Sequence, residues 1–322
     1  MNRRNAVLAA LSLASASGTS FAQASWPEKG VRIILPFAPG GQTDAVARLL
    51  ATKLRDKFNQ PFTVENRPGG GGMVATEMVA RSPADGYTLV FTSASISVNT
   101  TLLAGQFKFD PVKDLAPIIW AASEPLALVV PVSLKAQNVA ELVALSKASA
   151  NGLNGAFNGS GTTSQIALEM LKQQSGAKIT SVPYKGGGPS TLALLAGEVD
   201  LCFATLATVK PHIDAGKLRA LAVTTAKPSG VLPGVSTMMA TYPDFEADNW
   251  FGLMGPRGIP ADVMKKLNAA AVEALQSPDS RATISKTGGE VVASTPEQFA
   301  RHMGDEIARY AKVIRTANIK PE

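Results

Sequence analysis

The sequence predicts an α/β protein of two lobes, with the second lobe inserted into the first. Strand-like and helical segments alternate along the chain, which is typical of a parallel sheet covered by helices. The alternation occurs in two sets, separated by the interrupted apolar stretch "LAPIIWAASEPLALVVPV" at 115–132. The chain has 322 residues, 45% of them hydrophobic, which is enough for roughly two domains.

The first set begins with the strand-like "VRIILPF" at 31–37. Val46, Leu50 and Leu54 then recur at helical spacing and predict a helix. Two further strands are expected at 61–66 and 87–93, with a helix at 73–82 between them and the polar loop "ASISVN" after them. We therefore expect a mostly parallel sheet with helices on both faces.

The apolar stretch at 115–132 predicts two strands that meet at a bend, because Pro117, Glu124 and Pro125 interrupt it. A second alternating set follows, and after it come a strand at 249–256 and three helical stretches. The last of these has Thr295 as its cap and Pro296 in its first turn. We expect residues 25–124 and 226–322 to form lobe 1, and residues 125–225 to form lobe 2.

The N-terminus has the features of a secretory signal peptide at 1–24. Arg3 and Arg4 precede the apolar stretch at 6–16, and small residues then allow cleavage after Ala22 or Ala24. The two arginines leave both the general secretory and the twin-arginine export routes open. We therefore expect a periplasmic product that carries no lipid anchor, since its single cysteine is Cys202.

Several functional classes lack their sequence signals. Basic residues are not clustered and aromatic residues make up only 6%, so no nucleic-acid partner is expected. The glycine-rich segments match neither nucleotide-binding fingerprint, and no metal-ligand spacing occurs, so we expect no cofactor. His212 and His302 are expected to be solvated surface residues, and Cys202 a buried hydrophobe.

Two glycine-containing segments have equivalent positions in the two lobes. "PGGQTD" at 39–44 and "GSGTTS" at 159–164 each join the end of a strand to the start of a helix. A helix N-terminus presents unpaired N–H groups and partial positive charge, so it binds a carboxylate without a cation. In open α/β sheets, ligands lie beyond the carboxyl ends of the strands. The two segments therefore predict a cleft that holds an anion from both sides.

Other residues near these segments have two readings each. Asp44 either binds an amine or caps the helix dipole, the simpler interpretation, and "RPGGGG" at 67–72 sets a structural turn. Asp200 either faces the cleft or closes a turn. Trp250 and Phe251 either line a pocket or fill the core.

The chain resembles the Bug (Bordetella uptake gene) family of receptors for tripartite tricarboxylate transporters. The resemblance rests on "WPEKGVRIILPFAPGGQTDAVAR", "VENRPGGGG", "ADGYTLVFTSAS", "NGSGTTSQIALE", "VPYKGGGPS" and "WFGLMGPRGIP". It implies a periplasmic Venus-flytrap fold, type II-like, whose two glycine loops hold the ligand carboxylate, partly through ordered water. The ligand-binding residues implied by the resemblance are Phe37, Gly40, Gly41, Gln42, Thr43, Ser93, Ser95, Gly159, Ser160, Gly161, Thr162, Thr163 and Asp200.

The resemblance implies a binding protein and not an enzyme. Its ligand would be a small carboxylate, such as a dicarboxylate, a tricarboxylate, an acidic amino acid or an aromatic acid, and its partners the membrane subunits of a transporter. We expect a monomer. A sensory receptor is a second possibility, and an enzyme on a similar two-lobed fold is a third that would need an acid–base pair we do not find.

Overall fold

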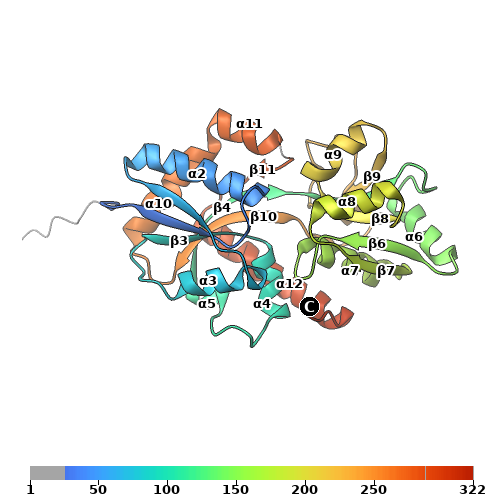
Figure 1. Cartoon of the computed structure of the whole chain (residues 1–322), viewed down its shortest axis with the longest axis horizontal. Helices are drawn as coiled ribbons and strands as arrows, with labels where there is room; N and C mark the ends of the chain where they lie inside the picture. Colours follow the sequence, from blue (N-terminus) through green and yellow to red (C-terminus); the bar gives the residue numbers. More distant parts are fainter. Residues whose placement is uncertain (1–25, 287, 322) are drawn as a thin grey trace, which may run out of the picture.

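The computed structural model describes residues 26–286 and 288–321. It has two lobes, each built on one sheet between helices (Figure 1). The predicted signal peptide at 1–24 lies outside the described residues. Among the described residues, no helix is long and apolar enough to cross a membrane.

Lobe 1 has a six-stranded sheet in the order β11-β4-β10-β3-β1-β2. Its strands are β1 (Val31–Leu35), β2 (Phe62–Asn66), β3 (Thr88–Ser93), β4 (Leu115–Glu124), β10 (Asn249–Pro256) and β11 (Glu290–Val291). Its helices are α2 (Gln42–Phe58), α3 (Met73–Ala80), α4 (Ser95–Leu102), α5 (Pro111–Asp114), α10 (Ala261–Gln276), α11 (Pro278–Lys286) and α12 (Pro296–Ala317), with the 3-10 turn η1 (Gly70–Gly72). One buried cluster joins the sheet to α2 and α10, and another joins it to α3 and the first half of α12.

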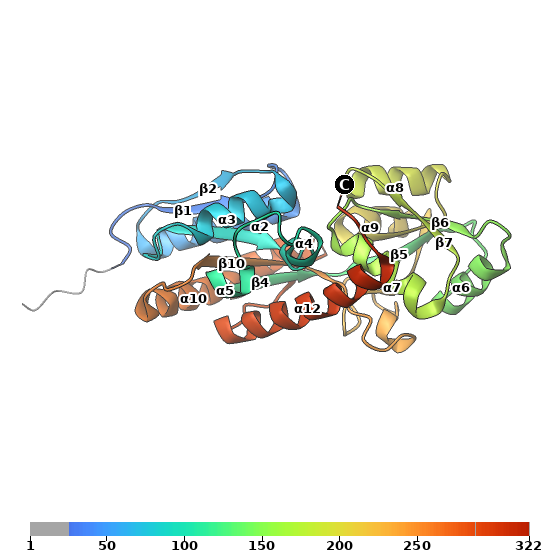
Figure 2. The ribbon, with the colours of Figure 1, turned by 90° about the horizontal axis from the view of Figure 1, so that it is seen from below.

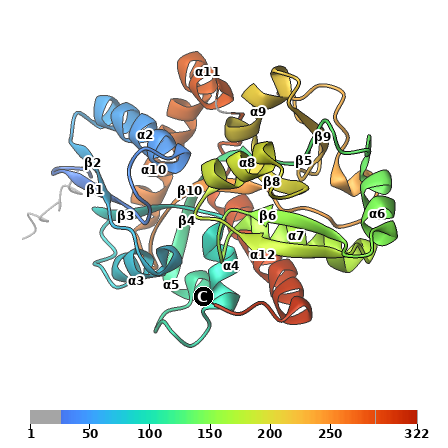
Figure 3. The same ribbon diagram turned by 45° about the vertical axis from the view of Figure 1, so that its right-hand side comes forward.

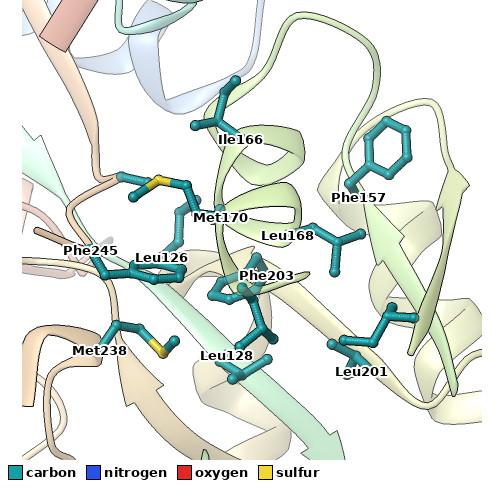
Figure 4. Close-up of a cluster of buried hydrophobic side chains, with 14 of the residues drawn as sticks. Leu126, Leu128, Phe157, Ile166, Leu168, Met170, Leu201, Phe203, Met238 and Phe245 are labelled. Atoms are coloured by element: carbon teal, nitrogen blue, oxygen red, sulfur yellow. The ribbon is translucent and has the colours of Figure 1, made fainter. Parts of the chain in front are cut away.

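Lobe 2 has a five-stranded sheet in the order β7-β6-β8-β5-β9. Its strands are β5 (Leu126–Pro131), β6 (Leu153–Phe157), β7 (Ile179–Pro183), β8 (Leu201–Thr205) and β9 (Leu218–Val223). Its helices are α6 (Val139–Ala148), α7 (Thr163–Ser175), α8 (Gly187–Ala196) and α9 (Leu206–Asp214). Clusters with α6 and α7 on one face and α8 and α9 on the other form its core, and Figure 4 shows the α7 side.

The two-lobed α/β fold is confirmed, but the sheets are mixed rather than mostly parallel. β1 pairs in parallel with β2 and β3, and β6 with β7 and β8. β10 and β5 run antiparallel to their neighbours on both sides. These two strands carry the chain into each lobe at the carboxyl edge of its sheet, so they must run against the strands that end there.

The chain returns to lobe 1 later than the sequence predicts. The predicted boundary at 226 follows the end of β9, but Leu232 packs in the core of lobe 2 beside α8 and α9. Met238, in η2 (Met238–Ala240), and Phe245 pack against strands and α7 of the same lobe (Figure 4). Lobe 1 resumes only at Asn249, the first residue of β10, which pairs with Glu124.

α12 connects the two lobes. The predicted cap is confirmed, since Thr295 and Gln298 form a capping box and Pro296 starts the helix. The first half of α12 packs on lobe 1, and its second half contributes Tyr310, Val313 and Ile314 to the core of lobe 2. Figure 2 shows the helix running beneath both lobes, on the side away from α8.

The segment "ASISVN" was expected to be a polar loop, but Ala94 is the N-cap of α4 and the other five residues lie in that helix. Val98 and Leu102 are one helical turn apart, and both are buried in the cluster that α4 shares with lobe 2. Ile96 is buried on the lobe 1 side. The alternation of polar and apolar residues hid this helix, because α4 is covered on two sides by different lobes.

Candidate ligand-binding cleft

The carboxyl edges of the two sheets face each other across the crossing between the lobes. β4 ends at Glu124 and β5 begins at Leu126, so one residue separates the two sheets. Glu124 is paired with Asn249 at the edge where β1 and β3 end, and Leu126 is paired with Thr205 where β8 ends. The strand-to-helix loops of both lobes therefore lie at facing edges of the two sheets, and Figure 3 shows α2 and α8 on either side of the crossing between the lobes.

The loop of lobe 1 before α2 leaves a helix N-terminus without a side-chain cap. Gly40 has a φ of +92°, which favours glycine, and Gly41 is the N-cap of α2 with no side-chain hydrogen bond. The Gly40 N–H instead donates to Asp44 Oδ2 at 3.2 Å. The first turn of α2 therefore presents backbone amides, and Gln42 and Thr43 lie there half-buried.

Asp44 is part of the support of this loop. The Asn66 amide donates both to Asp44 Oδ1 at 3.0 Å and to the carbonyl of Phe37 at 3.1 Å. The Arg48 guanidinium, and then the Asn66 amide and the Gly40 N–H, hold the pKa of Asp44 down at about 2 against the effect of burial. The capping interpretation of Asp44 is therefore the one that the contacts favour.

The loop of lobe 2 before α7 is held by its own residues. Gly159 and Gly161 have φ values of +119° and +73°. Thr162 is the N-cap of α7, and its hydroxyl donates to the carbonyl of Gly159 at 2.7 Å. The Gly161 N–H donates to Gln165 Oε1 at 3.0 Å. Thr163 follows at the first position of α7 and is 6% exposed.

Close contacts of Gly72, Gly71 and Asn99 form a continuous wall between the two loops. A Cβ added to Gly72 would lie 3.2 Å from Pro36 Cβ and 3.8 Å from the ring of Phe37. A Cβ on the neighbouring Gly71, or on Gly161 of lobe 2, would collide with the side chain of Asn99. The wall thus runs from the loop of lobe 1 through η1 and α4 to the loop of lobe 2.

Sequence reasoning missed Asn99 and the role of η1. Asn99 fell within an expected loop, and "RPGGGG" was interpreted as a turn alone. The three glycines of η1 all have positive φ, so the turn is structural, but it also forms part of the wall. The sequence did contain a signal for the second role of this segment, since it has four consecutive glycines at 69–72, whereas one or two are enough for a turn.

The predicted serines lie at the carboxyl end of β3. Ser93 is the last residue of this strand and Ser95 the first of α4, and their hydroxyl oxygens are 3.0 Å apart. Ser93 is buried and Ser95 half-buried. Ser160 lines a cavity of about 200 Å³ with Gly71 and Asn99.

Asp200 lies at the wrong end of lobe 2 for the predicted role. It precedes β8, and its carboxylate accepts from the Asn154 N–H at 2.7 Å. Asn154 is near the amino end of β6, so Asp200 closes a turn at the edge of the sheet opposite the cleft. We leave it out of the site.

The expectation that His302 is a solvated surface residue is also wrong. Its ring stacks on Trp120 with the centroids 3.8 Å apart. Burial, with the positive charge of Arg309, lowers the pKa of His302 to about 4. Trp250 and Phe251 fill the core, and so does Cys202, whose pKa is raised by burial to about 12.

The residues of the two glycine loops offer a ligand neutral hydrogen-bond donors and no cationic side chain. Neither glycine loop contains Lys or Arg. Glu124, at the crossing between the lobes, is 1% exposed, and burial raises its pKa to about 8 even though Asn249 and Thr205 hydrogen-bond to it. No group of His, Cys, Asp or Glu that could hold a metal occurs within residues 26–286 and 288–321.

Residues 46–319 match the family model described as the tripartite tricarboxylate transporter family receptor, TctC. The chain belongs to this family. It is 37% identical to protein BugT of Bordetella pertussis over 298 residues, 92% of this chain and 91% of that protein. The predicted resemblance is confirmed. The family consists of solute-binding receptors and not of enzymes.

Two solved structures extend this comparison. The R. palustris protein Rpa4515, solved with adipate, superposes with a TM-score of 0.79 at 36% identity, covering 92% of this chain and all of that one. MatC from Rhodopseudomonas palustris, solved with bound malate, gives a TM-score of 0.75 at 30% identity, covering 90% of this chain and all of that one. Receptors of this fold are periplasmic binding proteins, and this TctC-family chain has their two-lobed architecture.

Proposed function

We propose that this receptor captures a small carboxylate between its lobes and delivers it to the membrane subunits of a tripartite tricarboxylate-type transporter. The observation that supports the proposal is the pair of helix N-termini, α2 and α7, whose glycine loops follow the carboxyl ends of strands in opposite lobes. Each presents backbone amides and partial positive charge, which suits a carboxylate. Relatives solved with adipate and with malate make dicarboxylates the first class to test.

The residues that we propose for the ligand are those of the two loops and the adjoining strand end. They are Phe37, Gly40, Gly41, Gln42, Thr43, Ser93, Ser95, Gly159, Ser160, Gly161, Thr162 and Thr163. A ligand that contacts both loops should favour the closed arrangement of the lobes. The lobes would reach it by a hinge motion around the crossing near Glu124.

A thermal-shift screen against carboxylic acids tests the proposal. The protein is first unfolded and refolded, so that no ligand is carried over from the cell. An acid that binds only the folded state raises the melting temperature, and the shift grows with the logarithm of its concentration once this exceeds the Kd. Small-angle scattering with the best acid should then show a smaller radius of gyration. Binding without any compaction would contradict capture between the lobes.

We also propose export with removal of the signal peptide, by cleavage after Ala22 or after Ala24. The mature protein then begins at Gln23 or Ser25, as the small residues before each site indicate. Mass spectrometry of periplasmic protein checks this, and an intact Met1 in that fraction would contradict it. Size-exclusion chromatography with light scattering tests the expected monomer.

A further inference from the structure

The side chain of Asn99 lies between the glycine loops of the two lobes. Asn99 is on α4 and is only 3% exposed, which is unusual for a polar residue. Its Nδ2 donates to the carbonyl of Gly71, in lobe 1, at 3.0 Å. A buried amide that is hydrogen-bonded to the backbone keeps its orientation, because breaking that bond would leave a buried polar group without a partner.

The Oδ1 end of the same amide lies against Gly161 of lobe 2. A Cβ added to Gly161 would lie 2.3 Å from Asn99 Oδ1, and one added to Gly71 would lie 2.7 Å from Nδ2. Real Cβ contacts essentially never fall below 3.0 Å. The amide therefore fills the space that the missing side chains of two glycines leave, one from each lobe.

The helix that carries Asn99 is itself attached to both lobes. α4 follows β3 of lobe 1 directly. Val98 and Leu102, on either side of Asn99 in the sequence, are buried in the lobe 2 cluster together with Tyr310 of α12. Asn99 thus has a fixed position from which to set the distance between the loops.

The lobe 2 loop has little else to hold it from this side. Ser160 Oγ is buried and has no hydrogen-bond partner among the residues that the structure describes. Ser160 lines the same cavity as Gly71 and Asn99, between the loop of lobe 2 and lobe 1. The contact between Gly161 and Asn99 therefore carries much of the positioning of this loop relative to lobe 1.

We propose that Asn99 is a positioning residue that sets the separation of the two glycine loops before a ligand arrives. It acts through Gly71 and Gly161 and touches no ligand. Only its expected effect on affinity rests on the proposed function, since the separation of the loops is a property of the free protein.

The test measures the distance between the lobes in the free protein. Lys108 in lobe 1 and Lys135 in lobe 2 are exposed, and each is replaced by cysteine for spin labelling. Cys202 need not be removed, because it is fully buried. We expect Asn99→Ala to broaden the distance distribution measured by pulsed electron paramagnetic resonance. Asn99→Asp, which keeps the shape but loses the donor to Gly71, should broaden it as well.

Thr100→Ala is the matched control. Thr100 is the next residue on α4 and is half-buried, but its hydroxyl donates to the carbonyl of Ile96 within the same helix, at 2.7 Å. We expect its distribution to match that of the parent. A parent-like distribution for Asn99→Ala, or equal broadening for Thr100→Ala, would overturn the proposal.

A double-mutant cycle tests the contact with Gly161 directly. Gly161→Ala forces a methyl group against the Asn99 amide, and Asn99→Ala removes that amide. The free energies of unfolding should therefore be non-additive, with the double variant more stable than the two single losses predict. Additive losses would show that the two residues do not interact and would overturn the proposal.

The affinity for malate and adipate completes the test. We expect Asn99→Ala to bind whichever of these probes the parent binds about tenfold more weakly, the equivalent of one lost hydrogen bond. An unchanged affinity would overturn the positioning role. Should the parent bind no carboxylate at all, the proposed function fails, while the distance measurement and the cycle still decide the role of Asn99.

Discussion

The two glycine loops that face the cleft look alike in the sequence but are supported in different ways. The lobe 1 loop depends on a network from outside it, in which Asn66, Asp44 and Arg48 hold Phe37 and Gly40. The lobe 2 loop is stabilised by bonds among its own residues and the first turn of α7. Equivalent positions therefore differ in what a substitution does to stability, even where the expected loss of binding is the same.

Gly41→Val and Gly161→Val should show this difference most strongly. Gly41→Val puts a side chain into the open space where we place the ligand, and Gly161→Val forces one against Asn99 and displaces the lobe 2 loop, so each should reduce carboxylate affinity at least about 100-fold, by analogy with losing several hydrogen bonds. Gly41 has a φ of −79° and open space beside it, so the fold should survive. Gly161 has a φ of +73° and contacts Asn99, so its variant should also lose about 2–4 kcal/mol of stability.

Isothermal titration and urea denaturation of both variants check this prediction. Gly188→Ala is a suitable control, since Gly188 lies on α8 with open space around its Cα. Equal stability of the Gly41 and Gly161 variants would contradict the difference that we draw between the loops.

Asp44→Ala and Gln165→Ala compare the two supports. Asp44 is 6% exposed and accepts from Gly40, Arg48 and Asn66, so its loss should cost about 3 kcal/mol. Gln165 accepts one bond that supports the loop, from Gly161, and its loss should cost about 1 kcal/mol. Denaturation with urea measures both, and a larger loss for Gln165→Ala would reverse our ranking.

The pH dependence of the parent should reflect Asp44 as well. Its pKa in the folded protein, about 2, is lower than the ordinary 3.8, so its stabilising effect is present above pH 4 and is lost as the pH falls through 2. Asp44→Asn should flatten this part of the stability curve. An unchanged acid limb would argue against the network.

Glu124 lies between the two lobes and should act in the opposite direction. Burial raises its pKa from 4.5 to about 8, so the folded state binds more protons than the unfolded state between these values. Stability contributed by neutral Glu124 is therefore complete below pH 4.5 and is lost as the pH rises through 8. Glu124→Gln should gain about 1–2 kcal/mol over the parent at pH 8 and little at pH 4.5.

Asp248 and Glu306 share the sign of this effect, since burial raises their pKa values to about 6 and about 8. The variant should therefore reduce the slope of stability against pH without abolishing it. Thermal melts at closely spaced pH values measure the slope, and an equal gain at pH 4.5 would show that the charge of Glu124 is not the cause.

Arg67→Ala should have the smallest effect. Arg67 is exposed and pairs with Glu65 at 3.3 Å, so the loss of stability should stay below about 0.5 kcal/mol. Carboxylate affinity should change less than about twofold, because surface pairs of this kind contribute little. If titration showed that this variant no longer binds, a cation and not the helix N-termini would hold the ligand.

The alternation of strands and helices predicted much of the fold, but not the direction of the crossing strands. β5 and β10 look like any other apolar strand in the sequence. Their antiparallel pairing follows from the edge at which the chain enters each sheet. The late return to lobe 1 was hidden for a similar reason. The sequence indicates that Met238 and Phe245 are buried, but it does not indicate which lobe they pack against.

The candidate loops were found from local features, and the residues that were wrong depended on distant ones. Gly40, Gly41 and the segment 159–163 follow strand ends, a property of neighbouring residues. Asp200 precedes its strand, so the direction of β8 places it at the far edge. His302 is on a helix beside charged residues, but Trp120 of β4 covers it.

The sequence by itself determined the segments that become helices and strands, the Thr295 cap, and the two glycine turns that end in helix N-termini. These depend on hydrophobic spacing and on capping within a few residues of chain. Only the tertiary structure decided that Gly161 faces Asn99 while Gly41 faces open space, and that Asn99 belongs to a helix between two lobes. Those facts come from contacts between segments that are distant in sequence, and the residues on one side of such a contact do not reveal what lies on the other.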